Sequence, residues 1–308
     1  MNNLQTLDKD LLSQIANIHS TPQGTYNIRK NGQSIDSNSD TDIQIVPKKN
    51  KEGIDVYVRA GTKNKSVHIP VIITESGIND LVFNDFYIGD GSEVTIVAGC
   101  GIHNTGKVKS EHNGIHSFHI GKNSKIKYIE KHLGLGNKSE KVLNPVTNIE
   151  MANDSELEME TVQLGGVTYS KRTTNAKLES NAKLIIKERL LTTEKHIAIT
   201  NFDVELIGKN SSVDVISRSV AKDSSYQEFN SNIIGKTECF GHVECDGIIT
   251  DKARIASTPR ILAEDVNASL VHEAAIGKIA SDQVNKLLTL GLSKEEAENV
   301  IIKGFLNG

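Results

Sequence analysis

A degenerate nine-residue repeat in the middle of the chain restricts its fold more than any other feature of the sequence. Successive copies start 32, 31, 27 and 29 residues apart, and the five starts are Ile88, Ile120, Met151, Leu178 and Ile207. The fourth position of each copy is Gly, Asn or Asp, the residues that most readily adopt a left-handed backbone. The fifth position is Ser or Ala, which is small enough to fit inside a tight bend. Each copy therefore predicts a sharp corner in the backbone.

A short segment of alternating polarity follows each corner. The seventh and ninth positions are apolar in all five copies, and the eighth is polar in all but one, where it is Ile185. Alternation of this kind indicates a strand with one buried face. A corner and a strand that recur near every 30 residues predict a β-helix with two or more strands per coil. Further copies are indicated at Gly61, Ile249 and Glu264. A sandwich of hairpins is the alternative, but the aligned corner residues favour the β-helix.

The two ends of the chain differ from its middle. Apolar residues between Leu4 and Ile18 follow a helical period, and a polar connection from Asn31 to Asp42 leads towards the strands. Near the other end, Ser281–Leu290 predicts a helix that stops at Gly291. Ser293 and Glu296 then form a capping box for a second helix. We expect an N-terminal helix and polar linker over 1–41, a β-helix core over 42–275 and a C-terminal helical segment over 276–308.

Composition narrows the functional classes. The chain of 308 residues is 37% hydrophobic and 24% charged, with a formal net charge of −4, which gives no electrostatic case for nucleic acid or an anionic membrane. The sequence shows neither a signal peptide nor an apolar stretch of membrane-spanning length. An odd count of three cysteines fits a reducing compartment, so we expect a soluble, cytoplasmic protein. A phosphate-binding Gly-rich loop ending in Gly-Lys-Ser or Gly-Lys-Thr is missing, so any ATP hydrolysis must come from a partner.

Several C-terminal segments resemble the SufB/SufD family of iron–sulfur cluster assembly proteins. They are the run Val271–Ile279, the segment Gly291–Ala297 with the following Phe305, and Cys245-Asp246 upstream of Pro259. The tail is specific as a set, and with the repeats the resemblance extends over roughly 42–305.

The resemblance implies a right-handed parallel β-helix whose C-terminal helices dock an ABC-type ATPase, SufC. It also implies pairing through the β-helix, as a homodimer or with a paralogue, and a nascent iron–sulfur cluster near that interface. The chain would then be a scaffold without catalytic activity. It looks like a minimal member, because the long N-terminal helical domain and the Cys-rich motif of larger members are not found in this sequence.

The predicted metal ligands are Cys245, His272 and Glu273. Family members of the SufB type have a Cys and a Glu where Cys245 and Glu273 stand. Three cysteines cannot supply four thiolates within one chain, but a two-fold dimer would bring two copies of these residues to one interface. Mixed ligands should hold iron less firmly than four thiolates, which suits a transient cluster.

Each predicted ligand also has a simpler interpretation. From the residues alone, Cys245 would be a small buried hydrophobic residue, and only the resemblance favours a ligand. His272 stands at the ninth repeat position, where other copies carry inward apolar groups, so it could be a core histidine. Glu273 has the opposite parity and should point outwards, as any solvated carboxylate would. Cys239 and Cys100 are expected to pack in the core.

Two open questions remain at the level of sequence. Five of the ten histidines lie between His103 and His132. A cluster of histidines can bind a metal, but the nearby Gly101 and Gly106 favour a surface loop.

The alternative functions are a β-helix enzyme, such as a lyase or an acyltransferase, and a structural, polymerising β-helix. We expect the helices at both ends to cap the β-helix, which disfavours the polymer.

Overall fold

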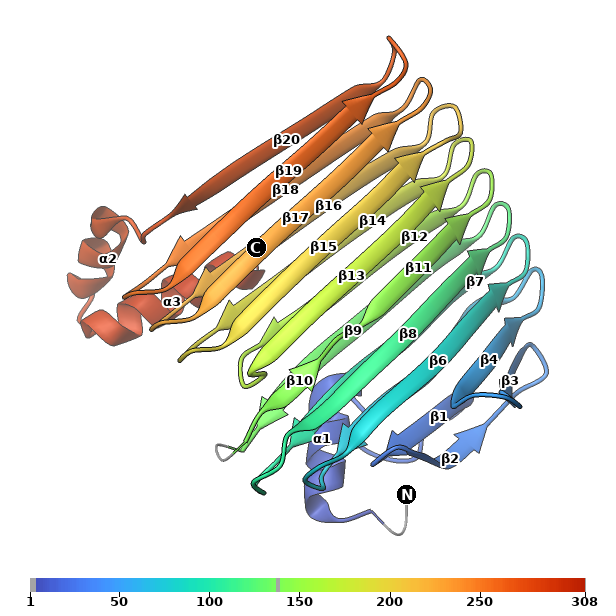
Figure 1. Ribbon diagram of the computed structural model, residues 1–308, viewed down its shortest axis with the longest axis horizontal. Helices are drawn as coiled ribbons and strands as arrows, with labels where there is room; N and C mark the ends of the chain where they lie inside the picture. Colours follow the sequence, from blue (N-terminus) through green and yellow to red (C-terminus); the bar gives the residue numbers. More distant parts are fainter. Residues whose placement is uncertain (1–3, 137–138, 308) are drawn as a thin grey trace.

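The computed structural model describes residues 4–136 and 139–307. Its strands form a parallel β-solenoid of about eight turns (Figure 1). From β4 (Gly53–Val58) onward the chain alternates between two facing sheets, so each coil contributes to both sheets. The β-helix predicted from the repeat is therefore confirmed, and a sandwich of hairpins is excluded. No helix in the described ranges is both long and apolar enough to span a membrane.

Sheet A contains ten strands in spatial order. They are β2 (Gln33–Asn38), β1 (Thr25–Lys30), β5 (Lys63–Ile73), β7 (Glu93–His103), β9 (Lys125–Leu135), β12 (Glu156–Leu164), β14 (Lys183–Thr192), β16 (Ser212–Ala221), β18 (Phe240–Ile249) and β20 (Ser269–Gly277). Every neighbouring pair is parallel except β1 with β2.

Sheet B faces sheet A across the core. In spatial order its strands are β19 (Arg254–Ala263), β17 (Tyr226–Gly235), β15 (Ile197–Leu206), β13 (Tyr169–Leu178), β10 (Lys141–Leu143), β8 (Ser110–Ile120), β6 (Asn79–Ile88), β4 (Gly53–Val58) and β3 (Ile43–Pro47). Strand β11 (Val146–Met151) continues β10 between β13 and β8. The β3–β4 pair is antiparallel, so both sheets begin with an antiparallel strand.

The corners occur where the repeat predicts them. The fourth repeat residues have φ between 55° and 66° in all five copies, and they are Gly91, Asn123, Asp154, Asn181 and Asn210. The fifth residues, from Ser92 to Ser211, are almost completely buried inside the bend. The seventh and ninth residues of all copies belong to one apolar cluster between the sheets. Local sequence thus determines both the corners and the stacked core.

The N-terminal helix α1 (Thr6–Ala16) packs on the outer face of sheet A rather than over its end (Figure 1). Leu11 and Ile15 lie on strand β7 at Gly99 and Gly101, where a Cβ would come within 3.0–3.3 Å of the helix. These two glycines therefore allow the close approach of α1.

Two expectations for the N-terminal half were wrong. The expected polar connection from Asn31 to Asp42 contains strand β2, which pairs with β1 and begins sheet A. The stretch from His103 to His132 was expected to be a surface loop but forms most of strands β8 and β9. His112, His116 and His132 point into the core. Their polarity hid the apolar alternation that would have indicated a strand.

The C-terminal helices are α2 (Ser281–Leu288) and α3 (Lys294–Asn307). The predicted capping box is confirmed: the Ser293 backbone N–H donates to Glu296 Oε2 at 2.8 Å, and the Glu296 N–H donates to Ser293 Oγ at 3.3 Å. Helix α3 packs through Ile302 and Leu306 on Val220. The expectation that helices cap both ends was wrong, since the last coil, β19 and β20, keeps its apolar residues exposed.

Candidate functional site

Cys245 lies on the inner face of β18, one coil before the end of the solenoid. Its exposed fraction is 1%, and it packs with the main apolar cluster. Burial raises the pKa of the Cys245 thiol to about 11, and nearby Ser257 opposes this shift without cancelling it. The residue is therefore a protonated thiol at neutral pH, and an approaching metal ion would have to displace its proton.

His272 lies on the inner face of the neighbouring strand β20. It is in register with Val243, so it sits one coil beyond Cys245 and two residues earlier along the strand direction. Both ring nitrogens of His272 are shielded from solvent but have no hydrogen-bond partner. Buried polar atoms normally find partners, because an unpaired buried group costs about 1–3 kcal/mol. This makes His272 the least satisfied polar side chain near Cys245.

Glu273 lies on the outer face of β20, as its parity predicts, and is exposed. It is in register with Glu244 on β18. Burial, and then the neighbouring Asp246 carboxyl, raise the pKa of Glu244. The three carboxyl groups form an acidic patch on the outside of the last two strands of sheet A. Glu244 and Asp246 were not predicted as site residues, although their positions on either side of Cys245 place them on the outer face of the same strand.

The structure thus brings Cys245 and His272 together inside the solenoid and places Glu273 on the other side of the sheet. Within the described part of the chain, no group of three or more His, Cys, Asp and Glu side chains could hold a metal ion. A three-ligand site at this end therefore stays a prediction that needs a second chain. Cys239 and Cys100 are buried in apolar clusters, which fits the packing role expected for them.

A polar row extends from Cys245 through the interior of sheet A. In neighbouring strands Cys245 is in register with Ser217, and Ser217 with Glu188. Glu188 accepts hydrogen bonds from Ser217 Oγ at 2.7 Å and from Thr200 Oγ1 at 2.9 Å. Thr161 and Glu130 continue the row on β12 and β9. The apolar ladder at the seventh and ninth positions gave no sign of this row.

Glu130 forms a buried ion pair with Arg172 from the facing sheet, and Arg172 also contacts His132 Nδ1 at 3.2 Å. Burial alone would raise the pKa of Glu130, but the charge of Arg172 and the contact with His132 hold it well below its usual range. The guanidinium and the carboxylate compensate each other's charge where both side chains are buried.

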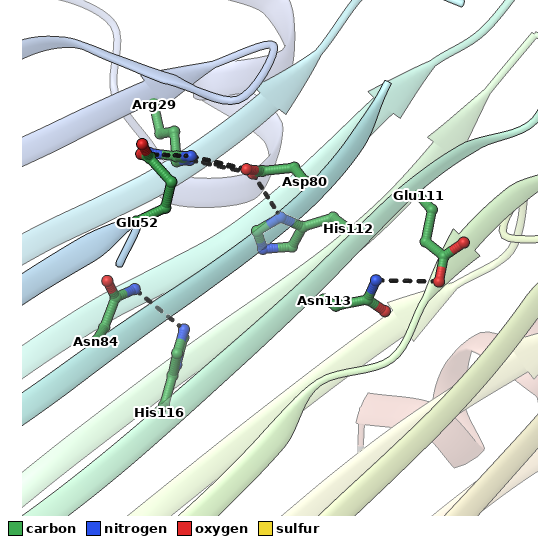
Figure 2. A network of polar contacts seen from close by, with 8 residues as sticks. All are labelled: Arg29, Glu52, Asp80, Asn84, Glu111, His112, Asn113 and His116. Atoms are coloured by element: carbon green, nitrogen blue, oxygen red, sulfur yellow. Dashed lines mark hydrogen bonds and ion pairs between the residues drawn. The ribbon is translucent and has the colours of Figure 1, made fainter. Parts of the chain in front are cut away.

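A second buried network lies nearer the N-terminus and is shown in Figure 2. Asp80 accepts hydrogen bonds from Arg29 Nη2 at 2.8 Å and from His112 Nδ1 at 2.9 Å. Arg29 also reaches Glu52 at 3.2 Å. His116, on the same strand as His112, contacts the Tyr128 hydroxyl at 2.8 Å through Nδ1. Two of the histidines that were expected in a surface loop therefore have their rings held by hydrogen bonds inside the solenoid.

Fold and site together define a parallel β-helix protein with an unsatisfied imidazole on its last coil and a buried thiol on the coil before it. Residues 79–305 match the family model described as SUF system FeS cluster assembly, SufBD core domain. The chain belongs to the SufBD family, and this membership connects it to iron–sulfur cluster assembly.

Curated relatives agree with this assignment. The chain is 28% identical over 260 residues to an iron-sulfur cluster assembly SufBD family protein of Archaeoglobus fulgidus, covering 83% of this chain and 69% of the relative. A protein of the same description from Methanocaldococcus jannaschii is 27% identical over 296 residues, 92% of this chain and 90% of the relative. The iron-sulfur cluster assembly protein SufD of Bacillus subtilis is 31% identical over 152 residues, 46% of this chain and 33% of the relative.

Proposed function

We propose that the chain is a non-catalytic scaffold on which a transient iron–sulfur cluster is assembled near the end of the solenoid. The observation that carries this proposal is the position of His272, whose two unpartnered ring nitrogens lie one coil beyond the Cys245 thiol. Cys245, His272 and Glu273 would provide thiolate, imidazole and carboxylate ligands. The cluster is the cargo of this site, and mixed ligands would let it leave more easily than four thiolates.

The last coil supports pairing of two β-helices. Strands β19 and β20 are the edge strands of the two sheets, and such edges readily pair with another chain. Ile261 and Ile276 are in register with the inner-facing Ile233 and Gly247, but no further coil lies beside them, and Ile261 is 46% exposed. A second copy or a paralogue placed there would bury this apolar surface. Its own last coil could supply the ligands that one chain lacks.

The C-terminal helices support docking of a SufC-like ABC ATPase. Leu290 is 74% exposed between α2 and α3, and Val300 is 51% exposed on α3. Because α3 is anchored to the solenoid through Ile302 and Leu306, force from an ATPase on these helices would reach the ends of β14, β16 and β18. ATP hydrolysis would come from that partner.

A cytoplasmic location fits the state of the cysteines. All three are free and buried, and free thiols persist most readily where the surroundings are reducing. We therefore assign the proposed assembly to the cytoplasm.

The test is anaerobic purification of the chain with and without a co-expressed SufC-like ATPase, followed by sizing and analysis of iron and sulfide. We expect a complex that carries iron and sulfide and loses both in Cys245→Ala and in Glu273→Ala. Cys239→Ala is the matched control, because this cysteine only packs in the core. Cluster loading that is unchanged in Cys245→Ala would contradict the assigned ligands, and a metal-free chain that does not bind the ATPase would contradict the scaffold itself.

A further inference from the structure

A row of stacked rings borders a groove on the outer face of sheet B. The Tyr57 and Tyr87 rings stack at a centroid distance of 5.0 Å and an angle of 11°, and the Tyr87 and His119 rings stack at 5.0 Å and 9°. Among the described residues, Tyr57, Tyr87 and Phe240 are the only exposed Phe and Tyr side chains, so two of the three stand in this ring row. The groove has a volume of about 910 Å³, and its lining residues lie mainly at the ends of β4, β6, β8, β11, β13 and β15 (Figure 1). Exposed rings gathered in one place mark an interaction surface.

Beside the ring row lies a central column of small residues with one charge at each end. It consists of the residues directly after β4, β6, β8, β11 and β13, which are Arg59, Gly89, Gly121, Ala152 and Glu179. The last four donate backbone hydrogen bonds to the strand before them in the sheet, so the column stays in register. The Arg59 side chain is 74% exposed, and its Nη1 lies 3.7 Å from the carboxylate of Asp42. Glu179 is exposed and makes no ion pair within the described part of the chain.

The central column is complementary to itself. Gly121 is its middle residue, and two strands of the sheet separate it from the charged residue at either end. A two-fold axis through Gly121, perpendicular to the sheet, places Arg59 of one copy against Glu179 of a second copy, and Gly89 against Ala152. Because the residues between the charges are small, the two backbones can approach closely there. The ring rows of the two copies then lie on opposite sides of the shared column and shield it from water.

We propose that this face of sheet B is a second self-association surface, on which two copies of the chain meet groove to groove and pair Arg59 with Glu179. The surface lies on β4 to β15, away from the last coil, so it does not depend on the proposed function. Two exposed ion pairs and a narrow apolar strip make a weak contact, with a dissociation constant on the order of 100 µM. At low micromolar concentrations this contact is dissociated. At higher concentrations it joins chains, or dimers formed through the last coil, into larger assemblies.

The test uses the full-length chain with Ile261→Lys, so that the last coil does not contribute to pairing. Sedimentation equilibrium from about 10 µM to about 1 mM should show a monomer and a dimer in exchange, with an association that weakens as salt is added. If Ile261→Lys is still a dimer at the lowest concentration, the same measurement follows the step from dimer to tetramer. A species whose mass does not change up to about 1 mM would overturn the proposal, whatever the outcome of cluster loading at Cys245.

Charge reversal tests the pairing itself. Arg59→Glu and Glu179→Arg each place like charges together twice in the dimer, so each should weaken association at least about ten-fold. The double variant Arg59→Glu with Glu179→Arg pairs opposite charges again and should recover the starting affinity to within about three-fold.

Lys171→Glu is the matched control, because this exposed residue on the outer face of β13 lies outside the groove and its replacement changes the net charge as Arg59→Glu does. All these side chains are exposed, so circular dichroism should be unchanged. Gly89 is not varied, because a Cβ there would lie 2.5 Å from the Ala60 backbone nitrogen and disturb the fold. Unchanged association in the single variants, or no recovery in the double variant, contradicts the proposal.

Discussion

Individual buried charged residues limit the substitutions that this solenoid can accept without losing stability. Asp80 is nearly completely buried and lies between the Arg29 guanidinium and the His112 ring. Burial alone would raise the pKa of Asp80, but the hydrogen bonds from His112 and Arg29 lower it to about 2. Arg29 has one other carboxylate partner, Glu52, whose side chain is 70% exposed. The charge of Asp80 is therefore the main compensation for a buried cation.

Replacing this charge should destabilise the protein strongly. We expect Asp80→Asn to lower the free energy of unfolding by about 3–5 kcal/mol at pH 7, because it leaves Arg29 buried with only a solvated partner. The measurement is urea unfolding of the metal-free protein. Asp10→Asn, an exposed carboxylate on α1, is the control and should change little. A difference below about 1 kcal/mol would show that water or Glu52 replaces Asp80.

The same residue predicts a pH dependence. A carboxyl group whose folded-state pKa is lowered stabilises the fold fully above its unfolded pKa, near 4, and loses this effect as the pH falls towards about 2. The parent protein should therefore lose about 2 kcal/mol between pH 5 and pH 2 through Asp80. The difference between parent and Asp80→Asn should shrink over this interval. A difference that stays constant with pH would contradict the assignment.

Residue types at the corners could be predicted from the sequence, but the polar interior could not. A left-handed corner depends on one residue, so Asn181 and Asn210 indicate it by themselves. An inward histidine such as His112 is stable only because Asp80, on another coil, pairs with it. That partner is 32 residues away in the sequence, and no local pattern connects the two. Cys245 was found through family resemblance, whereas Glu188 behind it was not found at all.

At the scale of elements, neighbouring coils approach closely enough to require glycine. A Cβ on Gly208 would lie 1.9 Å from the Ser180 backbone nitrogen of the adjacent coil. We expect Gly208→Ala to destabilise the fold by about 1–3 kcal/mol or more, because a backbone rather than a flexible side chain must move. Thermal unfolding measures this effect. Gly277→Ala is the matched control, since no atom lies within 4 Å of its new methyl group; equal effects of the two changes would contradict the close packing.

The capping box predicts the local stability of α3. Ser293→Ala removes the acceptor for the Glu296 N–H and should destabilise this helix by about 1 kcal/mol. Hydrogen exchange should then be about five-fold faster for amides in the first turns of α3 and unchanged in the solenoid. Thr289→Ala, at the end of α2, is the control because its hydroxyl donates only within its own turn. Faster exchange in both variants alike would argue against the capping box.

The helical segments illustrate what amphipathic periodicity can and cannot predict. The existence and the starts of α2 and α3 followed from the apolar spacing and the capping box, whereas α2 ends at Leu288, two residues before the predicted end at Leu290. Their position did not, because an apolar face does not specify which surface covers it. Ile302 packs beside Val220 on the flank of the solenoid, so the last coil stays open.

For the whole molecule, the open coil predicts a change of oligomeric state. Under the proposed pairing, Ile261→Lys introduces two like charges into a two-fold interface, and sedimentation should change from dimer to monomer. Circular dichroism should be unchanged, because Ile261 is already 46% exposed. Ile197→Lys, an exposed isoleucine on β15 away from the end, is the control. A dimer that persists in Ile261→Lys would mean that pairing uses another surface.

The stacking of coils also fixes the distances between interior side chains in steps of one coil. Cys100 on β7 and Cys245 on β18 both face the interior of sheet A and are separated by five strand-to-strand steps, or about 24 Å at roughly 4.8 Å per step. Each coil contacts mainly its neighbours, so gain or loss of one coil would leave both thiol environments intact. Evolution could then adjust the spacing of two interior thiols in fixed increments, without changing the packing around either one.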